Sequence, residues 1–288
     1  MPELPEVETV CRGLRPMLVG RRLTRVDQRR ADLRFPFPQG FAAHLTGAQV
    51  TAIDRRAKYI LIRLSDGWTW LVHLGMSGRF TITPGARASS GQAGHNSGWA
   101  LAEPHDHLIA ETEDGARVVY NDVRRFGFMD LIPPGGDATS KHLAGLGPEP
   151  LDPAFDAEYL SGVLAGKRTP IKAALLDQHI VAGLGNIYIC EALWRAGISP
   201  RRLAAGVRGV RAERLVRAVK DVLDAAIAAG GSSLRDYVQA SGELGYFQHA
   251  WDAYDRAGEV CRRADCGGQI QRIVQSGRST YFCSRHQR

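Results

Sequence analysis

The sequence has few cysteines and no long apolar segment. Five cysteines in 288 residues are an odd number, which argues against a framework of disulfide bonds. No stretch approaches the roughly 18 consecutive apolar residues of a membrane-spanning helix. The first ten residues, MPELPEVETV, contain three glutamates, whereas a secretory signal begins with basic residues followed by an apolar run. We therefore expect no membrane segment and a protein that stays in the cytoplasm.

The composition is that of an ordinary globular protein with a basic excess. Hydrophobic residues make up 44% and charged residues 23%, which excludes a disordered or collagen-like chain. At roughly 150 residues per domain, the length predicts about two domains. Lys and Arg number 37 against 30 Asp and Glu, a net charge of +7, and residues 256–288 carry seven arginines against two acids. Such an excess is typical of nucleic-acid binding, with a solvated basic surface as the alternative.

The first 132 residues combine one helix with short strands. Apolar residues at spacings of three and four predict a helix over residues 3–18, which Gly20 closes. From about residue 21 the chain changes to short segments rich in β-branched and aromatic residues, which predict an antiparallel β domain. These segments are 49–53, 59–64, 68–73, 80–83, 107–111 and 118–121. Residues 84–104 are rich in Gly, Ser and Ala and are interpreted as an insertion loop without chemistry of its own.

Helical patterns dominate the rest of the chain. Residues 133–152 begin with Pro-Pro-Gly-Gly and are predicted to form a linker. The segment 269–283 alternates like a β-hairpin around a Ser-Gly turn. The predicted helices are 156–164, 170–178, 187–196 and 208–229. The fold class is therefore α+β, with a β domain at 1–132, a helical domain at 153–248 and a hairpin ribbon at 249–288.

Three of the five cysteines lie close together near the C-terminus. Cys261, Cys266, Cys283 and His286 form a C-x4-C pair and a C-x2-H pair separated by sixteen residues. Four soft ligands in two close pairs, joined by a segment of hairpin length, suit one tetrahedral structural Zn²⁺ ion. The other two, Cys11 and Cys190, lie singly in helical patterns and are predicted to be small buried hydrophobic residues.

The N-terminus carries a second group of reactive residues. Once Met1 is removed, Pro2 has a secondary amine, and α-amino groups have pKa values of about 8. The positive end of the following helix favours the uncharged, nucleophilic form of that amine. Attack on an aldehydic carbon would give an iminium ion that withdraws electrons during eliminations, and Glu3 and Glu6 lie on one helical face beside it for proton transfer. The alternative is ordinary helix initiation, since proline and acids are common in a first helical turn.

A glycine-rich turn lies between two of the predicted helices. In the segment 181–188, VAGLGNIY, Asn186 is predicted to cap the following helix, whose first amides can bind phosphate. A dinucleotide-binding fingerprint is excluded because Tyr188 stands where a glycine is required. The turn is therefore either a plain connection between helices or part of a helix pair that grips a DNA backbone.

Six sequence blocks, in order along the whole chain, resemble one family. They are MPELPEVETV at the start, RRAKYIL around Lys58, HLGMSG at 73–78, NDVRRFG at 121–127, GLGNIYICE at 183–191 and GRSTY at 277–281. In these blocks the chain resembles the bacterial formamidopyrimidine-DNA glycosylases, which are bifunctional glycosylase/lyases that remove oxidised purines. Leu4 fits the purine-specific branch, because the sister endonuclease VIII branch usually has glycine there.

The resemblance implies a fold and a set of roles. The fold would be an N-terminal helix with a β-sandwich, a helix-two-turn-helix domain and a zinc ribbon. Pro2 would be the Schiff-base nucleophile, Glu3 the proton donor and acceptor at the sugar, and Lys58 a second basic group near the phosphate of the damaged nucleotide. Met76, Arg124 and Phe126 would fill the gap left by an extruded base, with Arg124 facing the orphaned cytosine. The alternative for Met76 and Phe126 is burial in the core of the β domain.

Contacts with DNA are implied at several further positions. Residues 231–247 correspond to the loop that closes over the oxidised base, the alternative being a plain interdomain loop. Arg278 would also assist the second elimination. Individually these basic side chains are weak candidates, because most Lys and Arg are simply solvated. The predicted phosphate contacts are His105, Arg124, Lys167, Lys172, Asn186 and Arg278. Glu6, beside the nucleophile, is also predicted to contact DNA, but not as a phosphate ligand.

Two features depart from the family pattern. The usual ribbon has two C-x2-C pairs, whereas here the first pair is widened and His286 replaces the last cysteine. Histidine is a competent zinc ligand, so we still expect one structural zinc ion. The insertion at 84–104 is the second departure, and we expect it to change nothing catalytic.

The function implied is that of a monomeric DNA repair enzyme associated with the bacterial nucleoid. It would act on double-stranded DNA containing 8-oxoguanine or a formamidopyrimidine and cleave the strand by β- and δ-elimination. Two alternatives remain at this point. One is an oxidised-pyrimidine glycosylase of the endonuclease VIII branch, and the other is a non-catalytic binder of damaged DNA whose N-terminus is blocked or keeps Met1.

Overall fold

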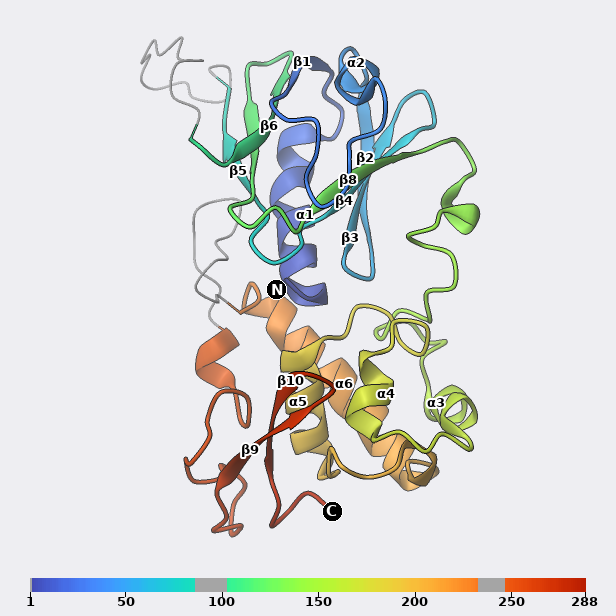
Figure 1. Ribbon diagram of the computed structural model, residues 1–288, viewed down its shortest axis with the longest axis vertical. Helices are drawn as coiled ribbons and strands as arrows, with labels where there is room; N and C mark the ends of the chain where they lie inside the picture. Colours follow the sequence, from blue (N-terminus) through green and yellow to red (C-terminus); the bar gives the residue numbers. More distant parts are fainter. Residues whose placement is uncertain (1, 86–102, 233–246) are drawn as a thin grey trace. The chain divides into compact units, whose positions relative to one another are not determined.

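The computed structural model describes residues 2–85, 103–232 and 247–288, which fall into two compact units. The first unit contains residues 2–144 and Ser232, and the second contains residues 145–231 and 247–288. Most of the predicted insertion loop at 84–104 and of the predicted capping loop at 231–247 lies outside the described residues. Figure 1 shows the elements of each unit.

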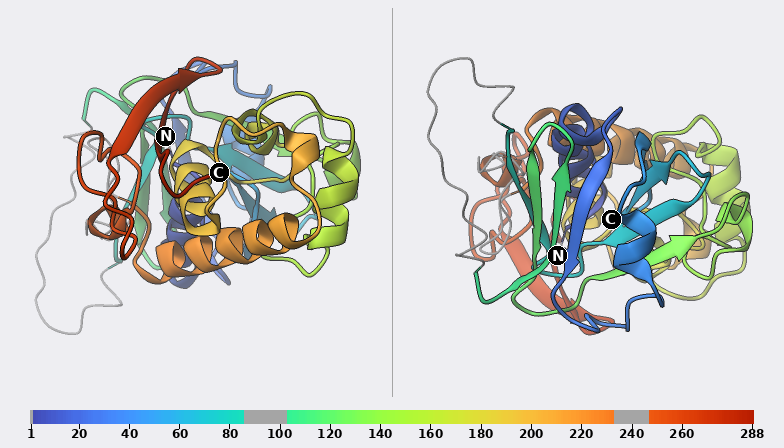
Figure 2. Two further views of the ribbon diagram at one scale, coloured as in Figure 1. Left: turned by 90° about the horizontal axis from the view of Figure 1, so that it is seen from below. Right: turned by 90° about the horizontal axis from the view of Figure 1, so that it is seen from above.

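The first unit consists of helix α1 (Leu4–Leu18) and two four-stranded antiparallel sheets. One sheet has the order β1-β6-β7-β5 and the other has the order β2-β3-β4-β8. Figure 2 (right) looks down on both sheets. The strands are β1 (Leu23–Gln28), β2 (Val50–Arg56), β3 (Tyr59–Leu64), β4 (Thr69–His73), β5 (Arg79–Thr83), β6 (Asp106–Thr112), β7 (Arg117–Asn121) and β8 (Phe128–Ile132). The predicted β-sandwich with an N-terminal helix is confirmed.

The core of this unit lies between α1 and both sheets. Apolar α1 residues at helical spacing, such as Val7 and Leu14, join Trp70 of one sheet and Tyr120 of the other in a single buried cluster. Each predicted strand segment overlaps an observed strand, but β1, β8 and the short helix α2 (Phe41–Leu45) were not predicted. β1 escaped prediction because its sequence, LTRVDQ, is mostly exposed or half-buried and lacks a clear alternation.

The second unit is helical and ends in a hairpin. Its helices are α3 (Ala157–Leu164), α4 (Ile171–Leu176), α5 (Asn186–Ala196) and α6 (Val210–Ala228), and the hairpin consists of β9 (Ile270–Gln275) and β10 (Arg278–Cys283). Helix α5 packs against α4, α6 and β10, and α6 crosses it at a large angle (Figure 2, left). Most residues of α5 are buried as a result of these contacts. The helices and the hairpin thus share one compact unit, with α5 at its centre.

The start of α5 differs by one residue from the prediction. Gly185, not Asn186, is the N-cap residue, and Asn186 is the first residue of the helix. The Asn186 side chain instead donates from Nδ2 to the carbonyl of Ser279 at 2.9 Å. An asparagine after a glycine-rich turn signals a helix start, but a glycine can occupy the capping position itself.

Candidate functional site

The first candidate group lies where α1 begins. Pro2 and Glu3 are buried, and Glu3 is the N-cap residue in an extended conformation. The Glu3 N–H donates to Glu6 Oε2 at 2.8 Å, and the Ser232 N–H donates to Glu6 Oε1 at 2.8 Å. Both oxygens of Glu6 therefore accept hydrogen bonds from the backbone, and Glu6 is only 2% exposed.

This arrangement corrects the predicted role of Glu6. A buried carboxylate that fixes two backbone segments is not placed to contact DNA. It instead holds the backbone of Glu3 directly beside Pro2. The positive end of α1 also lies at this point, because the first turn of a helix exposes unpaired N–H groups. The geometry agrees with the predicted pairing of Pro2 and Glu3 at a helix start.

Lys58 lies in the tight turn between β2 and β3. Arg56 pairs with Tyr59, so Ala57 and Lys58 form a two-residue turn, and Ala57 has a φ of 54°. A non-glycine residue in this left-handed region is strained. Lys58 is 8% exposed, and its charge contributes to lowering the pKa of His73. The turn thus holds a cation close to the HLGMSG segment, which begins with the last residue of β4.

His73 anchors that segment in its neutral form. Burial, together with the charges of Lys58, Arg34 and His142, lowers the pKa of His73 to about 4. A neutral imidazole has one nitrogen free to accept, and Nδ1 accepts from the Gly75 N–H at 3.1 Å. The ring also stacks on Phe128, with centroids 5.2 Å apart and planes at 16°. The position of the loop that follows His73 is therefore set from the end of β4.

The loops 74–78 and 122–127 cross at very close range. A Cβ atom on Gly75, which has a φ of 63°, would lie 2.2 Å from the backbone nitrogen of Gly127. A Cβ atom on Gly127 would lie 1.9 Å from the hydroxyl of Tyr120. Only glycine leaves room for this crossing, which brings the loop that carries Met76 against the loop that carries Phe126.

The three predicted gap-filling residues lie on these crossing loops. Phe126 is 45% exposed, Arg124 is exposed and Met76 is half-buried. The Arg124 guanidinium lies over the Phe126 ring, 5.0 Å from its centroid. Because neither Met76 nor Phe126 belongs to the core clusters of the first unit, the alternative of core burial is excluded. His105 is also exposed and lies near this region of the unit, because its carbonyl accepts from the Asp122 N–H at 3.1 Å.

Two predicted phosphate contacts of the second unit meet at the start of β10. Asn186 and Lys172 both donate to the carbonyl of Ser279, at 2.9 and 3.1 Å, and Lys172 Nζ also donates to the hydroxyl of Thr280 at 2.6 Å. Lys172 is fully buried. The prediction that it contacts a phosphate is therefore corrected: its ammonium group anchors the hairpin to α4. Lys167 is half-buried and Arg278, at the hairpin tip, is exposed.

The four predicted zinc ligands come together in the second unit. Their ligand atoms all lie within 4.8 Å of one another. The Sγ atom of Cys261 lies 3.3 Å from His286 Nδ1, and the Sγ atoms of Cys266 and Cys283 are 3.6 Å apart. In tetrahedral zinc sites with Zn–S bonds of about 2.3 Å and Zn–N bonds of about 2.0 Å, ligand atoms are separated by roughly 3.5 to 3.8 Å. The four side chains therefore fit one structural zinc ion.

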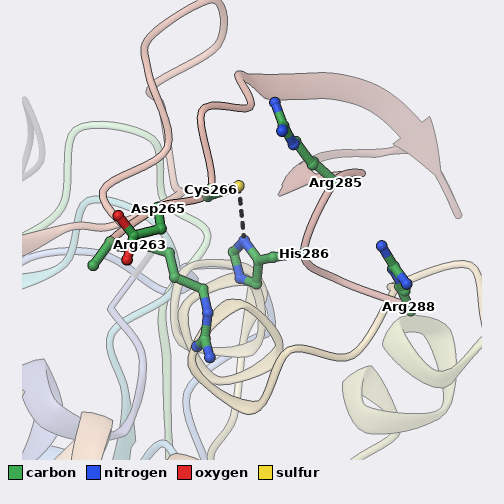
Figure 3. Close-up of a pocket in the computed structure, with 7 residues that line it drawn as sticks. Arg263, Asp265, Cys266, Arg285, His286 and Arg288 are labelled. Carbon is green, nitrogen blue, oxygen red and sulfur yellow. Dashed lines mark hydrogen bonds between the residues drawn. The ribbon is translucent and has the colours of Figure 1, made fainter.

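Helix α5 orients two of these ligands. His286 Nε2 lies 3.1 Å from the carbonyl of Trp194, to which it donates, so Nδ1 is the nitrogen that points to the sulfurs. Figure 3 shows His286 facing Cys266 in this way. The indole N–H of Trp194 also donates to Cys261 Sγ at 3.4 Å. Burial lowers the pKa of His286, which favours the neutral form that binds metal.

The widened first pair keeps both sulfurs in place. The Cys261 N–H donates to the carbonyl of Gly268 at 2.8 Å, and the four intervening residues turn back through Asp265, which has a φ of 57°. Arg263, Arg285 and Arg288 line a cavity of about 320 Å³ beside the ligands (Figure 3).

The two cysteines outside the zinc site, Cys11 and Cys190, are buried as predicted, and burial raises the pKa of the Cys11 thiol to about 12.

Sequence reasoning missed two buried acids that organise this chain. Glu191 is fully buried and accepts from the N–H groups of Asp252, Ala253 and Tyr254 at 2.7 to 2.9 Å. It thereby fixes the segment that leads into the hairpin. Asp122 is also fully buried. Both lie inside blocks that carry the resemblance, and an acid among apolar residues was the signal available for Glu191.

Comparison with known proteins agrees with this organisation. Three domain families match in order: the formamidopyrimidine-DNA glycosylase N-terminal domain at residues 1–129, its H2TH domain at 146–238, and a zinc finger found in FPG and IleRS at 258–285. A formamidopyrimidine-DNA glycosylase of Rhodospirillum centenum is 60% identical, with both chains covered completely. The chain belongs to the formamidopyrimidine-DNA glycosylase family. Another family member, from Acidiphilium cryptum, is 56% identical over the full length of both chains.

Solved structures of the formamidopyrimidine-DNA glycosylase family share the fold. MutM (Fpg) from Thermus thermophilus is 37% identical, with a TM-score of 0.84, covering 99% of this chain and 98% of its own. A Lactococcus lactis Fpg mutant in complex with DNA containing Fapy-dG is 33% identical, with a TM-score of 0.87 and complete coverage of both chains. Among the described residues, no helix is both long and apolar enough to cross a lipid bilayer.

Proposed function

We propose that this protein is a bifunctional DNA glycosylase and abasic-site lyase that excises oxidised purines from double-stranded DNA. The observation that carries the proposal is the start of α1, where Pro2 and Glu3 are buried together and Glu6 fixes the Glu3 backbone. Full-length similarity to glycosylases, one of them bound to Fapy-dG DNA, supports the same reaction class. The protein would act as a monomer in the bacterial cytoplasm.

The first unit would carry the chemistry. With Met1 removed, the Pro2 nitrogen attacks C1′ of the damaged nucleotide, the bond from C1′ to the base breaks, and the base leaves with the bonding electrons and takes up a proton. The Pro2 nitrogen gives up its proton, Glu3 protonates O4′ as the C1′–O4′ bond breaks and the sugar ring opens, and the resulting iminium ion at Pro2 is the electron sink. Loss of a C2′ proton then expels the 3′ phosphate, and a second elimination, assisted by Arg278, expels the 5′ phosphate. Lys58 would bind the phosphate of the damaged nucleotide.

Extrusion of the damaged base would depend on the crossing loops. Removing a base from the stack costs a few kcal/mol, and an inserted apolar side chain recovers part of that cost. The exposed Phe126 ring and half-buried Met76 supply apolar surface. The Arg124 guanidinium, over the Phe126 ring, would donate hydrogen bonds to the orphaned cytosine.

Phosphates of the duplex would bind His105, Lys167, Asn186 and Arg278. Asn186 uses one amide hydrogen to hold Ser279, and an amide nitrogen carries a second. Zinc, when bound to its four ligands, would supply structure only: it would join the strand that ends in Cys283 to Cys261 and His286, both of which bond to Trp194 of helix α5. The capping of the oxidised base by residues 231–247 remains part of the proposal, and most of that segment lies outside the described residues.

The test is borohydride trapping on a duplex that contains 8-oxoguanine opposite cytosine. We expect a covalent adduct that peptide mapping places on Pro2, and an intact mass that lacks Met1. A variant with one glycine inserted before Pro2 is the matched control, because it keeps every side chain but blocks the secondary amine; it should give no Pro2 adduct.

The lesion panel separates the alternatives. An adduct on thymine glycol but not on 8-oxoguanine would place the protein with the oxidised-pyrimidine enzymes. Absence of an adduct on both lesions, with DNA binding retained, would refute the catalytic proposal.

A further inference from the structure

A fully buried acid, Asp122, lies where the two crossing loops meet. Its Oδ1 atom accepts from the hydroxyl of Ser77 at 2.5 Å. Its Oδ2 atom accepts from the Gly127 N–H at 2.8 Å and from the hydroxyl of Tyr120 at 3.4 Å. Both carboxylate oxygens are therefore acceptors, and each binds a different loop.

The bonds from Ser77 and Gly127 end next to gap-filling residues. Ser77 directly follows Met76, and its Oγ atom also accepts from the Arg124 N–H at 3.0 Å. Gly127 directly follows Phe126. One hydroxyl thus links the Met76 loop to the backbone of Arg124, while the other carboxylate oxygen fixes the far end of the Phe126 loop.

The backbone of Asp122 extends the network to His105. The Asp122 N–H donates to the His105 carbonyl at 3.1 Å, and His107 Nε2 lies 2.9 Å from the Asp122 carbonyl. Asp122 therefore bonds to the segments that carry Met76, Arg124, Phe126 and His105. These are the residues of the first unit, apart from Pro2, Glu3 and Lys58, that we place against the DNA.

We propose that Asp122 is a positioning residue for base extrusion, which acts through Ser77 and Gly127 to hold Met76, Arg124 and Phe126 in the geometry that enters the duplex. The proposal rests on the gap-filling role of these three side chains. Asp122 itself does not touch DNA, because no part of its side chain is exposed. Bonds to a buried carboxylate are stronger than neutral ones, and no water can replace them when they are lost.

An asparagine cannot reproduce both halves of this arrangement. Its amide has one acceptor oxygen, whereas Asp122 accepts on both sides. The Gly127 N–H can only donate, so the amide oxygen must face it. The NH₂ group then faces Ser77. The Ser77 oxygen must now accept from this NH₂ group instead of donating to residue 122, while it still accepts from the Arg124 N–H. Asp122→Asn therefore keeps the volume and weakens the Ser77 link. Ser77→Ala removes the bonds of the Ser77 hydroxyl to Asp122 and to the Arg124 N–H and leaves the bond from Gly127 to Asp122 in place.

The experiment compares two substrates in single-turnover kinetics. The first is a duplex with 8-oxoguanine opposite cytosine, in which a stacked and paired base must be extruded. The second has a preformed abasic site, which has no base to extrude. For Asp122→Asn and Ser77→Ala we expect base excision to slow about tenfold or more, as the loss of a charge-assisted hydrogen bond predicts. Strand cleavage at the abasic site should stay within about threefold of wild type.

A second readout concerns the base opposite the lesion. Arg124 can prefer cytosine only if its backbone is held in place, so both variants should discriminate less between cytosine and adenine opposite 8-oxoguanine. A loss of stability alone would lower the amount of active protein for both opposite bases equally. It would leave their ratio unchanged.

Asp114→Asn is the matched control. Asp114 lies at the other end of the β6–β7 hairpin and also accepts a 2.5 Å hydrogen bond from a hydroxyl, that of Thr112. Among the described residues its carboxylate bonds to Thr112 and Arg21 and to neither crossing loop. Its loss should leave the ratio of the two rates and the opposite-base preference unchanged. Urea unfolding of all variants measures the cost in stability.

The outcomes separate the two proposals. If wild-type protein gives no Pro2 adduct on either substrate, the proposed function fails. If wild-type protein is active but Asp122→Asn and Ser77→Ala slow both reactions equally and keep the cytosine preference, Asp122 is merely structural and the inference is overturned. If Asp122→Asn does not fold, Ser77→Ala decides the question alone.

Discussion

The two units hold their functional loops by different means. In the first unit, buried carboxylates bind the backbone directly: Glu6 holds Glu3 and Ser232, and Asp122 holds Gly127. In the second unit, the buried Glu191 carboxylate fixes the segment that leads into the hairpin, whereas the hairpin that carries Arg278 is held by a four-ligand metal site and by the buried ammonium group of Lys172. The first arrangement is complete within the polypeptide, whereas the second also needs an ion.

This difference determines which change would disrupt the functional loops of each unit. A hydrogen-bonded loop loses one contact at a time, and neighbouring bonds keep part of its geometry. A small hairpin with little core of its own depends on its zinc, because the free energy of zinc binding then supplies the free energy of folding. The buried residues around the hairpin form only a small cluster that includes three of the zinc ligands.

Removal of zinc should have the largest effect. Cys283→Ser, or chelation of the wild-type protein, should weaken binding to duplex DNA by about a hundredfold, because the strand that carries Arg278 loses its support. Fluorescence anisotropy against salt concentration measures the loss and should show a shallower salt slope. The reaction of the Pro2 amine with a small aldehyde should be unchanged. If that reaction is lost as well, the contrast between the units is wrong.

Lys172→Met tests the second support of the hairpin. The variant removes the hydrogen bonds to Ser279 and Thr280 but keeps most of the buried volume. We expect a loss of about 2 kcal/mol in the free energy of unfolding, measured by urea denaturation of the zinc-loaded protein. Lys220→Met is the control, since Lys220 also donates to a backbone carbonyl, that of Asp152 at 3.2 Å, but is more exposed. It should change stability by less than about 0.5 kcal/mol. Equal losses in both variants would contradict the anchoring role.

The first unit should show a pH dependence that comes from His73. Its pKa is about 4 in the folded protein and 6.5 in the unfolded chain, so the unfolded state binds the extra proton between these values. The free energy of unfolding should therefore fall as the pH drops from 6.5 to about 4, and this contribution should be complete below pH 4. His73→Asn keeps an acceptor for Gly75 but does not titrate. The difference in stability between the two proteins should shrink on acidification; a constant difference would show that His73 is not buried in its neutral form.

His286→Cys should have the smallest effect. A thiolate replaces the imidazole as the fourth ligand, and outside the ligand set the substitution loses the hydrogen bond to the Trp194 carbonyl. We expect full zinc occupancy, measured by mass spectrometry of the native protein, and a loss of about 1 kcal/mol in stability. His286→Ala is the comparison and should lose zinc. Retention of zinc by the alanine variant would show that three cysteines suffice.

The elements with a strong local pattern could be predicted from the sequence. Helices α1 and α6 have long amphipathic patterns, and β3 and the β9–β10 hairpin have clear alternation or turn signals. The zinc ligands were also predictable, because their spacing alone encodes the chemistry. Strand β1 was not predictable, because it is stabilised by pairing with β6 and its polar sequence has no strand pattern of its own.

The roles of buried charges could not be predicted. Lys172 and Glu6 resemble surface residues in the sequence, and only the folded chain shows that both are enclosed and bound to backbone groups. Asp122 likewise lies two residues before an exposed arginine pair in NDVRRFG. Whether a charged side chain faces solvent or a buried partner can depend on a segment more than 40 residues away, as it does for Asp122 and Ser77. The residues that surround the charge in the sequence do not identify such a partner.

The crossing of Gly75 and Gly127 has a consequence for the evolution of the sequence. A methyl group at either position would lie within 2.2 Å of another atom, and at Gly75 the obstacle is backbone that cannot turn aside. Both sites, fifty-two positions apart in the sequence, therefore accept only glycine. A substitution at either site is excluded even when the other site keeps its glycine. A library of all single substitutions, selected for survival under oxidative mutagenesis, should return glycine alone at both positions, while the exposed Val123 beside them varies freely.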